Sequence, residues 1–330
     1  MPNIALILLV SAEFCFYLLI AQTGIVEYFN SNLSIISFLP IGALVGTVGS
    51  LFINFRYKFQ ILIIVQMTLT LFYPNLNPFM LFIMGMSLGA ISVMVIELLK
   101  SSTQDDIMFA LIISYTLGTL LFNSDLEGRW VIGYMLSTTV FISSFFVDFN
   151  SQKIEKFEID ILYTDSYLPH SIFIMFIWVF LDSTLFESLS RDINISIWRD
   201  GFSREIILFH IIGVVTAIKL RLDRDNQQLI ILVSFILSFA FYILNEPILL
   251  SIIYPFVISF YNVVILQTLI KESSFIKLSF AMLLIGWGAS GMGLFLALNH
   301  LITPIFIVLI LMIGYYFRDK IKLRSQYGIA

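Results

Sequence analysis

Long stretches of apolar residues recur along nearly the whole 330-residue chain. A helix needs about 20 mostly apolar residues to cross the roughly 30 Å hydrocarbon layer of a membrane. We predict membrane helices at residues 3–22, 33–54, 60–73, 78–99, 107–122, 130–147, 171–189, 205–219, 228–244, 247–269, 277–298 and 302–317. The third, fifth and eighth stretches are short, so ten crossings remain an alternative to twelve. The pattern therefore predicts an all-α polytopic membrane protein.

The composition excludes the other broad classes of protein. Hydrophobic residues make up 59% of the chain and charged residues 12%, whereas soluble domains have about 45–50% apolar residues and about twice this charge. A net charge of −4 gives no support for binding to nucleic acid, and the many Phe residues exclude disorder. The single Cys15 and three separated histidines predict no metal site. Because nucleotide-binding and hydrolase motifs are absent, we expect no cofactor and no enzyme activity.

Basic residues fall mainly into alternate loops, which predicts the orientation of the chain. Cytoplasmic loops of membrane proteins are enriched in Lys and Arg. When the N-terminus is placed in the cytoplasm, the basic residues in outer loops are only Arg129, Arg191, Arg199 and Arg204. All the other Lys and Arg residues then lie on the cytoplasmic side. We therefore expect a multi-pass protein of the cell membrane with both termini in the cytoplasm.

The apolar stretches divide into two similar sets of six. A polar segment at 149–169 separates residues 1–148 from residues 170–330, and we interpret it as a cytoplasmic linker between two halves, the second of which ends in a short basic tail. In each half the loop after the second stretch is basic, and one acid lies about ten residues into the first helix. These acids, Glu13 and Asp182, would lie roughly 15 Å from the start of their helices, near the middle of the bilayer.

Glycines and basic residues recur at related positions in the two halves. They are Gly42, Gly46, Gly49, Arg56 and Lys58 in the first half, Gly213 and residues 222–225 in the second, and Gly118, Gly286, Gly288, Gly291 and Gly293 in the fifth and eleventh stretches. With six plus six helices and cytoplasmic termini, this layout resembles the major facilitator superfamily. Asn54 stands where the signature of that family has an aspartate, and the chain is short for the family. The resemblance implies a secondary transporter whose halves rock around a midplane site.

Charged side chains near the middle of a membrane helix mark candidate binding residues. Such a side chain is costly to insert and usually faces a cavity or a partner. Glu13 has Tyr17 one turn later and Asp182 has Trp178 one turn earlier, so each acid shares a helix face with an aromatic ring. A carboxyl group withdrawn from water favours its neutral form, so these acids could bind a cation or exchange a proton with it. The alternative is a protonated acid that only hydrogen-bonds to a neighbouring helix.

Two polar residues on the tenth predicted helix complete the candidate binding set. Tyr261 and Asn262 lie within the stretch at 247–269, and Tyr254 lies seven residues before Tyr261 on the same face. Hydrogen bonds between helices, worth about 0.6 kcal/mol each, are the alternative role for these residues. The lone His210 is interpreted as a packing residue. We predict that a small solute, an ion or a proton binds at Glu13, Tyr17, Trp178, Asp182, Tyr261 and Asn262.

Three functions remain open from the sequence. The first is a secondary transporter with alternating access, in which the midplane carboxylates could couple transport to protons. The second is a transporter-like but non-transporting membrane subunit of a larger assembly, such as a respiratory complex. The third is an intramembrane enzyme that acts on lipid-linked substrates. The outer loop from Ser190 to Arg204, with Trp198, is interpreted as an interfacial segment or as a docking site for other membrane subunits.

Overall fold

The computed structural model describes residues 3–29, 32–52, 57–148, 167–192, 195–199, 201–220, 222–301 and 303–327, without the side chains at 33, 167–170, 315 and 317–327. Most of the predicted linker, the loop residues Asn54 and Arg56, and the side chains of the basic tail lie outside the described residues. The described residues form helices and turns, with no strand among them. In chain order the helices are α1 (Ile4–Phe16), the π-helical η1 (Tyr17–Ile25), α2 (Val26–Tyr28), α3 (Leu33–Ile36), α4 (Phe38–Gly49), α5 (Lys58–Thr70), α6 (Pro78–Leu99), α7 (Gln104–Leu121), α8 (Arg129–Ser144), α9 (Tyr167–Arg191), α10 (Ser203–Lys219), α11 (Arg224–Ile243), α12 (Pro247–Leu269), α13 (Phe275–Met282), the π-helical η2 (Leu283–Ala289), α14 (Ser290–Leu298) and α15 (Thr303–Tyr327).

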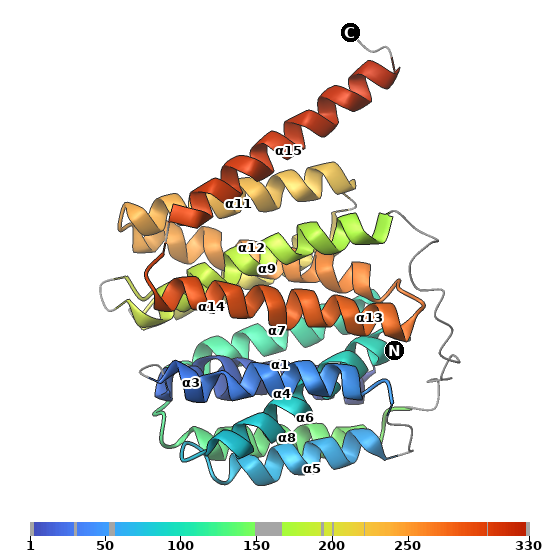
Figure 1. Ribbon diagram of the computed structural model, residues 1–330, viewed down its shortest axis with the longest axis vertical. Helices are drawn as coiled ribbons and strands as arrows, with labels where there is room; N and C mark the ends of the chain where they lie inside the picture. Colours follow the sequence, from blue (N-terminus) through green and yellow to red (C-terminus); the bar gives the residue numbers. More distant parts are fainter. Residues whose placement is uncertain are drawn as a thin grey trace.

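Each stretch predicted as a membrane helix contains helix in the structure (Figure 1). The segments long and apolar enough to cross a membrane are Ile4–Tyr28, Pro78–Leu99, Ser171–Arg191, Arg224–Ile243, Pro247–Leu269 and Phe275–Leu298. Shorter apolar helices lie at Ser34–Gly49, Lys58–Thr70 and Thr303–Gly314. The described part of the chain is therefore an all-α, multi-pass membrane protein, and the count of twelve crossings stays a prediction.

The helices form two groups that follow the order of the chain. In Figure 1 the helices from α1 to α8 lie in the lower part of the molecule and those from α9 to α15 in the upper part. Contacts between the groups include α7 against α10 and α4 against η2. The first helix runs further than predicted, because α1 continues through η1 into α2 and ends at Tyr28 rather than at residue 22.

Glycines allow α4 and α6 to pack backbone against backbone. A Cβ atom added to Gly42 would lie 2.0 Å from the carbonyl oxygen of Phe82, and one added to Gly46 would lie 2.0 Å from that of Met86. A similar contact joins α10 to α12, where a Cβ atom on Gly213 would lie 2.5 Å from a carbonyl oxygen of α12. Small residues of this kind let membrane helices approach closely and gain van der Waals contact.

The glycines of the eleventh predicted helix do not all serve close packing. A Cβ atom on Gly293 would lie 2.7 Å from the Cβ atom of Ser183 on α9, whereas one on Gly291 would meet nothing within 4 Å. Only part of the expected close packing is therefore present, because Gly291 is turned away from the neighbouring helix.

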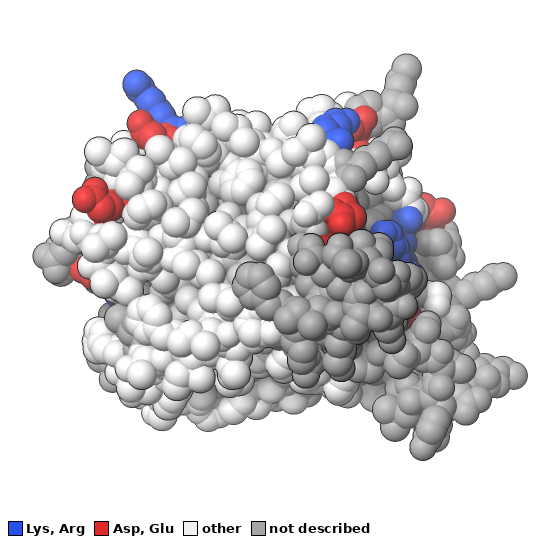
Figure 2. All heavy atoms as spheres, turned by 90° about the horizontal axis from the view of Figure 1, so that it is seen from above, with Lys and Arg blue, Asp and Glu red and all other residues white. Residues whose placement is uncertain are grey.

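The outer surface has a broad apolar belt. Large hydrophobic side chains are exposed there, among them Phe79 at 71%, Ile310 at 66% and Leu311 at 66%. Figure 2 shows one face of the molecule, on which the charged side chains of the described residues lie toward its two ends and leave the middle uncharged. A belt of this kind suits the hydrocarbon layer, since lipid rather than water faces these side chains.

Candidate functional site

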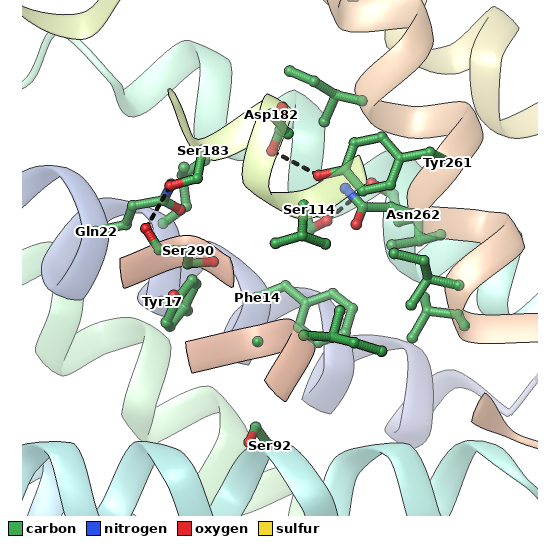
Figure 3. A pocket seen from close by; sticks show the side chains of 18 of the residues that line it. Phe14, Tyr17, Gln22, Ser92, Ser114, Asp182, Ser183, Tyr261, Asn262 and Ser290 are labelled. Atoms are coloured by element: carbon green, nitrogen blue, oxygen red, sulfur yellow. Dashed lines mark hydrogen bonds between the residues drawn. The ribbon is translucent and has the colours of Figure 1, made fainter. Parts of the chain in front are cut away.

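A cavity of about 320 Å³ lies between the two groups of helices (Figure 3). Its walls come from α1, η1, α6 and α7 in one group and from α9, α10, α12, α13, η2 and α14 in the other. Both π-helical segments contribute, through Tyr17 and Gln22 of η1 and through Gly286 and Trp287 of η2. Such segments are frequent at functional sites, and the volume is at the lower end of the about 300–1,000 Å³ typical of small-molecule sites.

Asp182 on α9 borders this cavity, and two tyrosines of α12 hold its carboxyl group. Tyr254 donates a hydrogen bond to Oδ1 at 2.9 Å. Tyr261 donates one to Oδ2 at 2.6 Å (Figure 3). The tyrosines are seven residues apart, so they share a face of α12, and both are fully buried. These two hydrogen bonds offset much of the cost of withdrawing the carboxyl group from bulk water.

Glu13 on α1 borders the cavity from the other group of helices. It is 5% exposed, and its Oε2 accepts a hydrogen bond of 3.2 Å from Nε2 of Gln66 on α5. The same nitrogen lies 3.1 Å from Oγ of Ser137 on α8. The sequence interpretation missed both partners, although the isolated Gln66 within an apolar stretch is a signal that could have been used.

A third polar group in the wall joins α7 to α10 and α12. Asn262 donates a hydrogen bond of 3.0 Å to the hydroxyl of Tyr115, and the Tyr115 ring stacks on His210 with centroids 4.4 Å apart. Nδ1 of His210 lies 2.6 Å from Oγ of Ser259. His210 is therefore packed, as expected, but it also lines the cavity, and Tyr115 is a lining residue that the sequence interpretation missed.

Of the two aromatic residues predicted beside the acids, Tyr17 lines the cavity and Trp178 does not. Tyr17 lines the cavity and meets Trp287 edge to face, with ring centroids 5.8 Å apart. Trp178 is 3% exposed and is not among the residues that line the cavity, and its Nε1 has no hydrogen-bond partner in the described structure. Trp178 shares a helix face with Asp182, but the neighbouring helices cover that turn of α9.

Residues 195–199 close the cavity at the end that the sequence predicts as outer, and we call them the outer seal. Trp198 is 4% exposed, lines the cavity and packs against Phe122, Phe186 and Tyr254. The described part of the loop therefore corrects the interpretation of Trp198 as an interfacial residue, because its ring fills the space between helices instead of facing the lipid headgroups.

Polar contacts fix the outer seal to the first group of helices. Nδ2 of Asn123, just beyond α7, donates a hydrogen bond of 2.8 Å to the carbonyl oxygen of Trp198. Arg199 forms an ion pair with Glu27 of α2, with Nη2 and Oε1 2.6 Å apart. At the opposite end, Lys219 of α10 pairs with Asp105 of α7 at 2.9 Å. Ion pairs thus join the two groups of helices at both ends.

Two charged side chains close to the predicted outer ends of helices are buried. Glu187 is 3% exposed and pairs with Arg191 one turn later, with Oε2 and Nη2 2.8 Å apart. Arg129 is also 3% exposed and donates hydrogen bonds to the carbonyl oxygens of Leu19 and Phe122. The carbonyls at a helix end lack partners in their own helix. The guanidinium group of Arg129 therefore supplies a donor to the carbonyl of Phe122 at the end of α7.

Comparison with known proteins identifies the architecture. No protein-family model and no curated protein sequence matches the chain. The crystal structure of the human organic anion transporter MFSD10 (TETRAN) matches with a TM-score of 0.60, over 95% of this chain and 96% of that chain, at 13% sequence identity. The chain therefore shares the fold of this structure, which is major-facilitator-like. The predicted resemblance is therefore confirmed at the level of the fold.

The major-facilitator-like fold gives the position of the cavity a physical meaning. In transporters built from repeats, the solute site typically lies near the midplane at the interface between the repeats. Of the predicted binding residues, those that line this cavity are Glu13, Tyr17, Asp182, Tyr261 and Asn262, and Trp178 is the exception. Their role in binding a solute stays a prediction.

Proposed function

We propose that this chain is a secondary transporter that moves a small solute by alternating access, with the central cavity as its binding site. The observation that carries the proposal is the cavity itself, which both groups of helices line and which Glu13 and Asp182 border from opposite groups. In this proposal residues 1–148 and 170–330 are the moving halves, joined by the linker at 149–169. Both termini face the cytoplasm, and twelve helices cross the cell membrane.

The ion pairs at the two ends support alternating access. The Arg199–Glu27 pair joins the halves beside the outer seal, and the Lys219–Asp105 pair joins them at the other end. Exposed pairs of this kind contribute only about 0.2–1 kcal/mol each. They are weak enough to break in turn when one end opens, yet they favour a closed end when the other is open.

Proton coupling through Asp182 and Glu13 is a second part of the proposal. A carboxyl group in a closed cavity exchanges protons with bulk water only when its side of the cavity opens. Because its charge also changes the affinity for a charged solute, the same acid can link the proton and the solute. The matched structure is that of an organic anion transporter, but the solute of this chain depends on the side chains of its own cavity.

Spin labels at the two ends test alternating access without knowledge of the solute. Pairs at Glu127→Cys with Glu246→Cys and at Ser101→Cys with Ser273→Cys report on the outer and inner ends, and the native Cys15 is buried. In proteoliposomes we expect two distance populations at each end. Acidification should raise one population at the outer end while it lowers the corresponding population at the inner end.

Variants of the acids make this test specific. We expect Asp182→Asn to abolish the response to pH while the protein stays folded, because the side chain no longer ionises. The matched control Asp225→Asn changes an exposed acid on α11 and should leave the response intact. A single, pH-independent distance at both ends would contradict the transporter proposal.

The alternative is a non-transporting membrane subunit of a larger complex, docked through the outer loop from Ser190 to Arg204. The cavity argues against it, because a purely structural subunit has no need for a space lined by two acids. Extraction from native membranes in mild detergent tests the alternative. Reproducible co-purification with other subunits in fixed ratio would support it, whereas a chain extracted alone or as a homo-oligomer would support transport.

A further inference from the structure

The wall of the cavity carries two acidic side chains and no strongly basic one among the described residues. Glu13 and Asp182 are its carboxyl groups, and none of the described residues that line it is Lys or Arg. His210 is the basic side chain in the wall, and its ring is engaged by stacking on Tyr115 and by Ser259 at 2.6 Å. An anionic solute would meet two carboxyl groups without a cation to offset the repulsion, whereas a cation would meet opposite charge.

The hydrogen bonds of Asp182 leave it able to receive a ligand. A carboxylate offers about four lone-pair positions, and the hydroxyls of Tyr254 and Tyr261 occupy one position at each oxygen. The remaining positions can accept from an ammonium N–H or face a quaternary nitrogen. Since the tyrosines fix the carboxyl group between α9 and α12, no large rearrangement is needed to receive a cation there.

Aromatic rings from both groups of helices surround the rest of the cavity. They include those of Phe14, Tyr17, Tyr115, Trp198, Tyr261 and Trp287. The face of an aromatic ring attracts cations, and cages of such rings bind quaternary ammonium groups. Leu18, Leu88 and Val95 add aliphatic surface, which would contact an apolar part of the same ligand.

We infer that this cavity selects small organic cations that carry an ammonium or quaternary nitrogen on an apolar or aromatic body, with Asp182 and Glu13 as the counter-ions. The inference rests on the proposed transport site and gives that site its substrate class. The volume of about 320 Å³ suits a ligand the size of a substituted benzylamine better than a large multi-ring compound.

Two probes that share a benzyl group and differ in charge test the inference. Benzyltrimethylammonium and benzylsulfonate are titrated into the purified full-length protein in detergent, and binding is measured by calorimetry. We expect the cation to bind and the anion to give no heat of binding. The Kd for the cation should rise at least about tenfold in the single variant Asp182→Asn, should also rise in the single variant Glu13→Gln, and should rise further in the double variant. The exposed control Asp225→Asn should keep its Kd within about twofold.

The outcomes separate this inference from the transport proposal. Tighter binding of benzylsulfonate than of the cation, no binding of either probe, or an unchanged Kd in both single variants overturns the organic-cation class. The two single variants keep the shape of the side chains. They therefore test the inference even if the double variant fails to fold. If the spin-label distances alternate but the cation does not bind, the transport proposal stands and the organic-cation class is rejected. If the cation binds but the distances do not alternate, the organic-cation class stands and the transport proposal is rejected.

Discussion

At the scale of single residues, the two acids of the cavity are each paired with a donor from another helix. Asp182 accepts from Tyr254 and Tyr261, and Glu13 accepts from Gln66. Within a membrane an unpaired polar group costs several kcal/mol, so each acid needs a donor from another helix. These donors keep the carboxyl groups at the cavity while the surrounding side chains remain apolar.

Replacement of Gln66 by Leu should therefore destabilise the protein. The change removes the contacts of Nε2 with Glu13 and Ser137, and two interhelical hydrogen bonds are worth about 1–2 kcal/mol together. We expect a lower midpoint of thermal unfolding in detergent, measured by the exposure of the buried thiol of Cys15. Gln60→Leu on the same helix is the control, since its side-chain oxygen has no partner in the described structure. Equal midpoints for the two variants would contradict the assigned role of Gln66.

The sequence predicts the acids of the site better than their surroundings. Charge within an apolar stretch identified Glu13 and Asp182, because a carboxyl group in a membrane helix is costly to insert and needs a nearby cavity or partner. Helical spacing placed Trp178 on the same face as Asp182, but spacing does not determine which turn of that face borders a cavity. Tyr115 and Trp198 became lining residues only through contacts distant in the sequence, which no local pattern records.

At the scale of helices, the contact between α4 and α6 depends on the absence of side chains. Gly46→Ala should lower stability by roughly 1–3 kcal/mol, because overpacking forces backbones apart and the new Cβ atom would lie 2.0 Å from the carbonyl oxygen of Met86. Gly49→Ala is the matched control on the same helix, where an added Cβ atom meets nothing within 4 Å. Thermal unfolding in detergent should show a lower midpoint for Gly46→Ala alone, and a loss shared by both variants would argue against this contact.

The outer seal should open more often when its ion pair is removed. Thr119→Cys places a thiol in the cavity wall, and a membrane-impermeant thiol reagent added outside intact cells measures access to it. Glu27→Ala should raise the labelling rate about two- to fivefold, as expected from the loss of an exposed pair.

The ion pair at the other end provides the control for this experiment. Asp105→Asn weakens the Lys219–Asp105 pair and should not raise labelling from outside, because it favours opening of the opposite end. If both variants raise the rate equally, the Arg199–Glu27 pair does not hold the seal specifically.

At the scale of the whole molecule, the orientation predicted from the basic residues can be tested directly. In intact cells an impermeant thiol reagent should label Glu246→Cys, in the turn between α11 and α12, and should not label Ser273→Cys, in the turn between α12 and α13. Both positions are exposed, so reactivity reports the side of the membrane. Permeabilised cells should label both variants, and labelling of Ser273→Cys alone in intact cells would reverse the predicted topology.

Tyr254 belongs to the acid site and to the outer seal at the same time. Its hydroxyl donates to Asp182, and its ring packs against Trp198 with centroids 5.8 Å apart. A cation bound at Asp182 shares the carboxyl group with this hydroxyl, so arrival of the solute acts on the ring that supports the seal. The empty carrier would then open outward less readily than the loaded one. Kinetically, such a protein favours exchange over net flow, and we expect unlabelled solute on the far side of the membrane to accelerate the release of labelled solute.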